Sequence, residues 1–343
     1  MKFEKKKLAE LMNCYAVCPI VRDGRSCYIF ATDDEGPCIC VDAETGEKET
    51  VWNEPGGTMS IVPLPRQNGD FLASQNFLPT FAAKEALIVR AFYRHHAWHT
   101  EPWLKLPYVH RFDILERNGS RYFLGCILSC TKEASADWDA PGYLCAAVLD
   151  PACSSPEQVE TIGPAMHRNH GYWKFQRDGY DCALTACDEG VFEVIPPQHR
   201  DGEWQITRIL AQAASDAVLV DIDKDGEAEL AVIEPFHGSQ LVLYHKQGSG
   251  YVEMYRHPKE MKFLHALWGG CLQGEQVLIA GYRELDRELF MLTWRDGHIC
   301  TERIECGGGA SNLCVVNHHG NNRLLVANRE ADEAVVFDCI GGE

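Results

Sequence analysis

DIDKDGEAELAV, residues 221–232, reads as the end of one β-strand, a tight turn and the start of a second strand. Asp221, Asp223 and Asp225 alternate before Gly226, and an apolar strand pattern resumes at Leu230. An Asp-Gly pair tolerates the positive φ angles that a two-residue hairpin turn requires. The segment therefore predicts a β-hairpin, and the same pattern recurs along the chain.

The strand, turn and strand pattern occurs at seven places. Each turn ends in a glycine, namely Gly24, Gly69, Gly119, Gly179, Gly226, Gly274 and Gly320. Successive glycines are 45, 50, 60, 47, 48 and 46 residues apart, which is the length of a four-stranded propeller blade. The sequence therefore predicts an all-β chain that folds over residues 1–343 as a single domain, a seven-bladed β-propeller with four-stranded blades.

The seventh repeat is short of one strand. Only residues 339–343 follow its third expected strand, so its outer edge would stay open, which β-sheets avoid. The segment Lys2–Leu8 precedes the first inner strand by about the distance at which the other outer strands precede theirs. We expect this N-terminal strand to close the seventh blade. The alternative is a surface helix, because Lys5–Met12 also fits one amphipathic turn.

The composition favours a soluble protein that binds neither nucleic acid nor a membrane. The 32 Lys and Arg against 50 Asp and Glu give a net charge of −18, which repels a phosphate backbone or an anionic membrane surface. Met1–Asn13 lacks an apolar run of signal-peptide length, and no segment approaches the ~18 apolar residues of a membrane span. The 16 Cys include no C-x-x-C pair, which favours reduced, buried thiols over disulfides or a zinc ribbon. We expect a cytoplasmic protein.

The 221–232 unit resembles the core of an FG-GAP or VCBS repeat, which is a β-propeller unit. Three carboxylates at alternating positions around a glycine turn can surround one hard cation with oxygens, so Asp221, Asp223 and Asp225 are predicted as a calcium loop. In FG-GAP units an Asp commonly completes the loop near the position of Glu229 here. The alternative is a solvated acidic turn, because the other six turns lack the pattern.

Histidines share one register relative to the turn glycines. The residues nine positions before the glycines are Tyr15, Ser60, His110, His170, Ala217, His265 and Ser311. The residues seven positions before the glycines form an almost wholly apolar ring, namely Val17, Val62, Phe112, Tyr172, Leu219, Leu267 and Leu313. Equivalent positions on a ring of blades point towards a common axis, so we expect His110, His170 and His265 to meet at the mouth of the central channel.

Three imidazoles with one open position form a catalytic ligand set for a divalent metal, here zinc or manganese. His167 could replace His170 if the inner strand begins earlier. Alternatively, the three histidines are structural, and each is hydrogen-bonded within its own blade.

Polar residues at the ends of the second strands are expected on the same rim. They are Asp33, Gln75, Asp188, Glu234, His237, Tyr282, Arg283, Asn328 and Arg329. Tyr15, Tyr282 or His237 could act as the catalytic base. Arg283 or Arg329 could hold a carboxylate bidentately.

Two long insertions, residues 75–84 and 131–142, are expected on this rim and are candidates for a lid. The His95–His99 cluster falls at a turn between outer strands, so we expect a surface turn there and no metal site.

The predicted site suits a small polar substrate better than a protein partner. Our first hypothesis is a metal-assisted lyase, dehydratase or isomerase acting on a carbohydrate or sugar acid. The chain is similar, in architecture and in its histidine ring, to carbohydrate lyases and dehydratases that are propellers holding a divalent metal through histidines. The second hypothesis is a non-catalytic scaffold that binds ligands or proteins, as FG-GAP and VCBS propellers often do. A glycoside hydrolase is a third hypothesis, for which no pair of carboxylates stands out.

Overall fold

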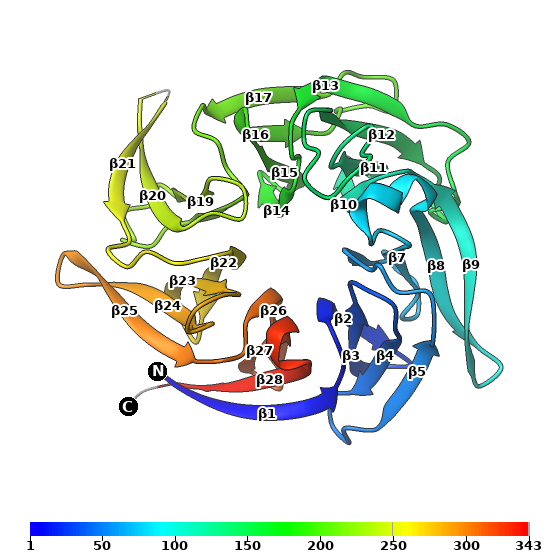
Figure 1. The fold of residues 1–343 in the computed structure, drawn as a ribbon, viewed down its shortest axis with the longest axis horizontal. Helices are drawn as coiled ribbons and strands as arrows, with labels where there is room; N and C mark the ends of the chain where they lie inside the picture. Colours follow the sequence, from blue (N-terminus) through cyan, green and yellow to red (C-terminus); the bar gives the residue numbers. More distant parts are fainter. Residues whose placement is uncertain (249, 342–343) are drawn as a thin grey trace.

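The computed structural model describes residues 1–248 and 250–341. These residues form seven four-stranded antiparallel sheets around a central channel (Figure 1). The prediction of an all-β, seven-bladed propeller is confirmed. The helices described are two short 3₁₀ turns, η1 (Thr80–Glu85) and η2 (Arg329–Ala331). Among the described residues, no helix is long and apolar enough to cross a membrane.

The first four blades follow one another along the chain. Blade 1 contains β2 (Cys14–Arg22), β3 (Arg25–Thr32), β4 (Cys38–Asp42) and β5 (Lys48–Trp52). Blade 2 contains β6 (Ile61–Pro63), β7 (Phe71–Gln75), β8 (Leu87–Arg94) and β9 (Ala97–Lys105). Blade 3 contains β10 (Val109–Arg117), β11 (Ser120–Ile127), β12 (Gly142–Leu149) and β13 (Glu160–Met166). Blade 4 contains β14 (Gly171–Arg177), β15 (Tyr180–Cys187), β16 (Gly190–Ile195) and β17 (Gln205–Leu210).

The remaining blades complete the ring. Blade 5 contains β18 (Asp216–Val220), β19 (Glu229–Glu234), β20 (Gln240–Gln247) and β21 (Gly250–Arg256). Blade 6 contains β22 (Leu264–Leu272), β23 (Glu275–Tyr282), β24 (Leu289–Arg295) and β25 (His298–Glu305). Blade 7 contains β26 (Ala310–His318), β27 (Asn321–Asn328), β28 (Glu333–Ile340) and the N-terminal β1 (Lys2–Glu10).

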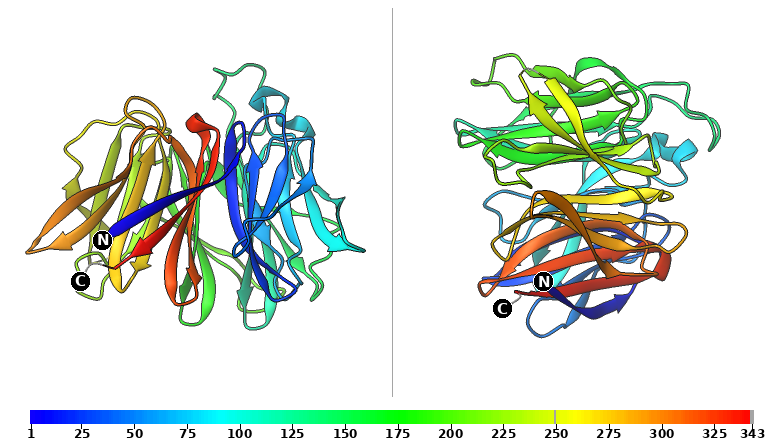
Figure 2. Two further views of the ribbon diagram at one scale, coloured as in Figure 1. Left: turned by 90° about the horizontal axis from the view of Figure 1, so that it is seen from below. Right: turned by 90° about the vertical axis from the view of Figure 1, so that its left-hand side faces the viewer.

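The ring closes through β1, as predicted. It pairs antiparallel with β28 from Lys2 opposite Ile340 to Glu10 opposite Glu333, which excludes the surface helix. Figure 2 shows β1 lying alongside β28 in blade 7. The Lys5 ammonium donates to Glu333 Oε2 at 2.7 Å, so a side chain of β1 also binds the first residue of β28.

The turn glycines adopt the positive φ angles that the sequence pattern predicts. In blade 3 the turn residues Asn118 and Gly119 have φ angles of 49° and 78°, as a type I′ hairpin requires. Blades 1, 4, 6 and 7 have the same two-residue turn. Blades 2 and 5 instead have longer connections, residues 64–70 and 221–228.

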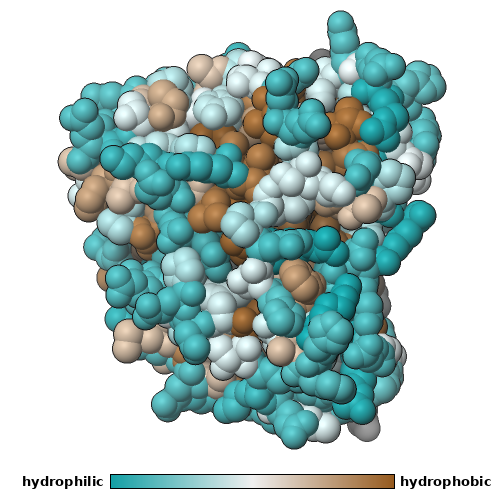
Figure 3. Space-filling model, turned by 90° about the vertical axis from the view of Figure 1, so that its right-hand side faces the viewer, coloured by the Kyte–Doolittle hydropathy of each residue, from teal (hydrophilic) through white to brown (hydrophobic). Residues whose placement is uncertain are grey.

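The core lies between neighbouring blades. The second strand of each blade is almost wholly buried, because sheets pack against both of its faces, which explains its near-continuous apolar sequence. All 16 cysteines are free and most are buried, so they act as small core residues. The outer strands are polar: β9 is largely exposed, and the side of the ring on which it lies has a mostly hydrophilic surface (Figure 3).

Candidate active site at the channel mouth

One end of the central channel opens into a cavity of about 230 Å³. The starts of the inner strands line it, and so do the loops that follow the second strands, which the sequence placed on the same rim. The lining residues are Tyr15, Asp33, Met59, Phe77, Leu78, Thr80, His110, Leu128, Trp138, His170, Phe236, His237, His265, Arg283 and Arg329. Residues of both long insertions are among them, so their predicted location is confirmed.

The inner strands of four blades begin with a β-bulge. The bulge turns the residue that stands nine positions before the turn glycine towards the channel. The pairing with the second strand shifts around Tyr15, His110, His265 and Ser311, each of which is the extra residue. An extra residue leaves the ladder and turns its side chain away from the normal alternation. In these four blades, the residue nine positions before the turn glycine is therefore the bulge residue.

Blade 5 departs from the register. Its turn is longer, so the residue nine positions before the turn glycine, Ala217, is not the one at the channel. Ser215 occupies that position instead. The Ser215 carbonyl accepts from His170 Nδ1 just as the Ser311 carbonyl accepts from His265 Nδ1, which identifies the two serines as equivalent positions. Five of the seven residues of the predicted apolar ring line the next layer of the channel, namely Val62, Phe112, Tyr172, Leu267 and Leu313.

Backbone carbonyls of the following blade determine the tautomer of the channel histidines. Nδ1 of His110 lies 3.1 Å from the His170 carbonyl, Nδ1 of His170 lies 3.2 Å from the Ser215 carbonyl, and Nδ1 of His265 lies 2.6 Å from the Ser311 carbonyl. A carbonyl oxygen only accepts, so each Nδ1 carries the hydrogen and Nε2 of the neutral ring keeps its lone pair. The histidines are thus bonded to the next blade through Nδ1, and Nε2 is the nitrogen that can bind a ligand.

Burial favours the neutral form of His110, His237 and His265. It holds the pKa of His110, His237 and His265 well below the ordinary histidine value, and neighbouring charged or titratable groups, His170 and Arg283 among them, lower it further. A neutral imidazole is the form that binds a metal.

Ring nitrogens of His170, His237 and His265 converge. One nitrogen of each lies within 4.8 Å of the others, and the Nε2 atoms of His170 and His237 are 3.3 Å apart. His237 comes from the loop after β19, where its φ angle of 47° bends the backbone towards the channel. His110 does not belong to this group, although its ring centroid is 4.3 Å from that of His170. The converging set therefore contains His237 in the place that the sequence assigned to His110.

Two tyrosines predicted as bases are placed differently from expectation. The Tyr15 hydroxyl lies 3.1 Å from His265 Nε2, and burial raises the pKa of Tyr15, so the hydroxyl stays protonated and donates to that lone pair. Tyr282 does not line the cavity. Its hydroxyl lies between Lys259 Nζ and Glu288 Oε2, 2.8 Å from each, within blade 6. The geometry thus makes Tyr15 a donor and removes Tyr282 from the site.

Blades 6, 7 and 1 give the cavity a charged wall. Arg283 donates from Nε and Nη2 to Glu330, and Arg329 donates from Nε to Asp33 Oδ2 at 2.5 Å. Within the described residues, Nη1 of Arg283 and Nη2 of Arg329 donate no hydrogen bond, so both keep donors for an anionic ligand. Burial raises the pKa of Asp33, against the opposing effect of Arg329.

Blades 2, 3 and 5 form the opposite, aromatic wall. Phe77 comes from the first long insertion and Trp138 from the second. Trp138 packs against Phe236 with ring centroids 5.1 Å apart, and Phe236 stacks on His237 at 3.9 Å. An aromatic wall facing a charged wall suits a ligand with one apolar face and several polar groups.

The acidic turn of blade 5 has the predicted carboxylates close together. Oxygens of Asp221, Asp223 and Asp225 lie within 4.8 Å of one another, but each residue also accepts a backbone N–H of the turn itself. Glu229, expected to complete the loop, is buried and accepts from Ile222 N and His245. The calcium loop remains a prediction.

Two further sequence features lie outside the cavity. His95 and His96 form the exposed β8–β9 turn, which confirms the expected surface turn. His167 pairs with Glu189, Nδ1 to Oε1 at 2.6 Å, and does not replace His170 in the converging set.

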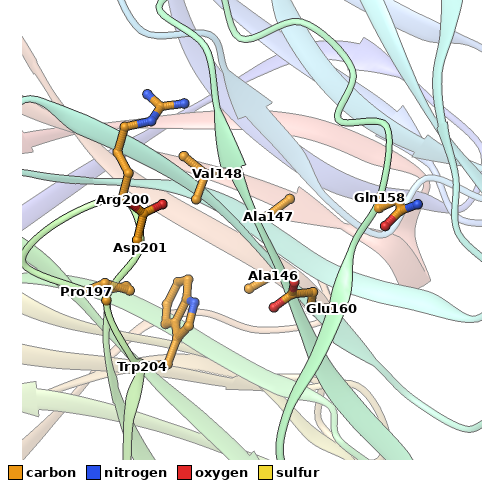
Figure 4. Close-up of a pocket in the computed structure, with 10 residues that line it drawn as sticks. Ala146, Ala147, Val148, Gln158, Glu160, Pro197, Arg200, Asp201 and Trp204 are labelled. Carbon is orange, nitrogen blue, oxygen red and sulfur yellow. The ribbon is translucent and has the colours of Figure 1, made fainter.

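A hollow of about 370 Å³ lies on the outer part of blades 3 and 4 (Figure 4). Its polar side chains, Gln158, Glu160, Arg200 and Asp201, are exposed, and it contains no histidine. Without buried polar groups that converge, it is a weaker candidate for a site than the channel mouth.

Comparison with known proteins bears on the fold. No protein-family model matches the chain, and a search of curated protein sequences gives no match. Among solved structures, the chain is similar to the β-propeller domain of Cps50 (Swd1) from Myceliophteria thermophila, with TM-score 0.62 and 11% identity over 98% of this chain and 100% of that chain. It is also similar to Sqt1 from Saccharomyces cerevisiae, with TM-score 0.58 and 8% identity over 99% of both chains. A third similar structure is a proposed 6-phosphogluconolactonase from Bacteroides fragilis, with TM-score 0.55 and 11% identity over 85% of this chain and 83% of that chain. At these identities the likeness establishes a β-propeller fold and nothing narrower.

Proposed function

We propose that this propeller is a metal-dependent enzyme that acts on a small sugar acid at the mouth of its channel, as a lyase, dehydratase or isomerase. The observation that carries the proposal is the two-sided arrangement of the histidines. Their Nδ1 atoms are held by backbone carbonyls, while ring nitrogens of His170, His237 and His265 converge in a cavity. Three imidazoles and an open position are a catalytic ligand set.

A divalent metal in this set, zinc or manganese, would polarise a carboxylate or carbonyl and so acidify the adjacent C–H. The chain's own groups supply the rest. Tyr15 donates a proton, and the free Nη atoms of Arg283 and Arg329 hold a carboxylate. With Tyr282 outside the cavity, Asp33 is the group for proton abstraction, because its raised pKa makes it a better base than an ordinary carboxylate.

The two walls of the cavity support a sugar acid as substrate. A sugar ring has an apolar C–H face, which fits the side of Phe77, Trp138 and Phe236, and polar edges, which fit the charged wall. One of the similar solved structures is described as a proposed 6-phosphogluconolactonase, which agrees with a carbohydrate substrate. The turn at residues 221–232 further supports the narrower proposal that the propeller is of the FG-GAP or VCBS type.

Elemental analysis and a substrate panel test the proposal together. We expect purified protein to hold about one zinc or manganese per chain. We expect the metal-loaded protein to convert a uronic or aldonic acid but not the matching neutral sugar. NMR measures the conversion. Stripping the metal with a chelator should stop turnover, and reloading should restore it. A protein that neither retains nor binds a transition metal, yet binds sugars without turnover, would instead be a binding scaffold.

Tyr15→Phe is expected to tighten zinc binding by about two- to tenfold. In the metal-free protein the hydroxyl occupies the Nε2 lone pair of His265, and a hydrogen bond of this kind contributes about 0.5–1.5 kcal/mol. Calorimetric titration with zinc measures the change, and Tyr282→Phe, a buried tyrosine outside the cavity, should leave the affinity unaltered. Weaker binding in Tyr15→Phe would mean that the Tyr15 oxygen is itself a ligand.

A further inference from the structure

A second cavity lies on the other side of the histidine layer. It has a volume of about 170 Å³, and its lining includes Arg111, Asp113, Tyr172, Asp216 and Asn312. His265 lines both cavities, so the inner chamber begins directly behind this histidine. Any group in the inner chamber that contacts a histidine does so from behind the converging nitrogens.

Asp216, the first residue of β18, is such a group. Its Oδ2 lies 3.4 Å from His170 Nδ1, whose one hydrogen is donated to the Ser215 carbonyl at 3.2 Å, so the carboxylate is a close neighbour of the ring and not its hydrogen-bond acceptor. Asp216 is 9% exposed, and it follows Ser215 as Arg111 follows His110 and Asn312 follows Ser311, which places all three at the inner chamber. His170 thus has one nitrogen facing His237, and its other nitrogen bonds to the Ser215 carbonyl with a buried carboxylate beside it.

Asp216 has no fixed counter-charge. In residues 1–248 and 250–341, no lysine or arginine nitrogen comes within 4.0 Å of it. Arg111 lines the same chamber, but its Nη atoms donate to the Met59 carbonyl and to Asn312 Oδ1. Asp113, the other carboxylate of the chamber, is paired with Lys174 Nζ at 2.7 Å. A buried carboxylate without a cation is costly, which calls for a positive charge on the far side of His170.

We infer that Asp216 is the charge-balancing residue of the metal site: the Ser215 carbonyl holds the His170 ring, and Asp216 lies behind that ring and balances the charge of a divalent cation held on the opposite nitrogen. This inference rests on the proposed function. A carboxylate close to the outer nitrogen of a metal-ligating histidine makes that ring a stronger ligand for the cation. The same cation offsets the free-energy cost of burying Asp216. Asp216 therefore stabilises the metal-bound protein and destabilises the metal-free protein.

Asp216→Asn, compared with Asp113→Asn, tests this role. The asparagine side chain keeps the shape of the aspartate but loses its charge, so we expect zinc binding to weaken by about 10- to 100-fold. The melting temperature of the metal-free variant should equal or exceed that of the wild type, because a buried unpaired charge has gone. Asp113→Asn should do the reverse: it leaves Lys174 without its partner, so the metal-free protein melts lower while zinc affinity is unchanged. The visible absorption of the cobalt-loaded protein should change in Asp216→Asn alone.

The outcomes separate this inference from the function on which it rests. If the wild type binds neither zinc, manganese nor cobalt, the proposed function and this inference both fail. If the wild type binds zinc and Asp216→Asn binds it equally well, the metal site stands and the role of Asp216 is refuted. A lower melting temperature of metal-free Asp216→Asn, with unchanged zinc affinity, would likewise refute it and make Asp216 a purely structural residue.

Discussion

Removal of residues 1–10 is expected to abolish the cooperative unfolding of the propeller. These residues form β1, which is paired with β28 along nearly its whole length and buries Ala9 against blades 1 and 7. Each lost backbone hydrogen bond costs about 1 kcal/mol, and the total stability of a native protein is only about 5–15 kcal/mol. The truncation also exposes the edge of β28, which favours aggregation.

Circular dichroism during heating and gel filtration measure this effect. We expect a broad, weak transition and soluble aggregates for the truncated chain. Adding a peptide of residues 1–10 in trans should restore part of the cooperativity, and Lys6→Ala, an exposed position in the same strand, should melt like the full chain. A truncated protein that remains monomeric and melts sharply would contradict the role of β1 in closing the ring.

His265→Ala is expected to remove most of the metal, while His110→Ala retains it. Both residues stand in the same register, are buried at 3% exposure and donate from Nδ1 to a carbonyl of the next blade. Only His265 contributes to the converging set with His170 and His237. Loss of a ligand should weaken zinc binding by more than the roughly 100-fold that an outer partner can cost.

Calorimetric titration with zinc compares the two variants, and their metal-free melting curves show whether each one folds. His96→Ala, in an exposed turn, controls for metal bound elsewhere on the surface. Equal loss of zinc in His110→Ala and His265→Ala would return His110 to the ligand set that the sequence register predicted. Full zinc binding in His265→Ala would contradict the proposed metal site as a whole.

Much of the architecture could be predicted because it is encoded locally. A turn such as Asn118-Gly119 needs two positive φ angles, so the residue types reveal the hairpin without knowledge of the rest of the chain. The spacing of such turns gives the blade length and the number of blades. The closing strand followed from a missing edge, since an open edge would be unfavourable. The rim positions of the two long insertions followed from the same alternation of strands.

The composition of the site was less predictable, because small differences in loop length decide it. The blade 5 turn moves the register by two residues, which replaces Ala217 with Ser215 and brings Asp216 beside His170. Its extra length was visible in the sequence and was the signal that could have revealed the shift. Tyr282 was placed on the rim with Arg283, but the adjacent residues of a strand point to opposite sides, and its hydroxyl faces Lys259.

By itself, the sequence determined the blades, the closure of the ring and the layer of the channel at which the histidines stand, because turn chemistry and the alternation of strands act over a few residues. Only the tertiary structure decided which nitrogens meet. His237 enters the set through a bend in the loop after β19, and His110 stays outside it although its local sequence signal equals that of His265. Convergence across a channel depends on the relative orientation of all seven blades, and no local pattern encodes that orientation.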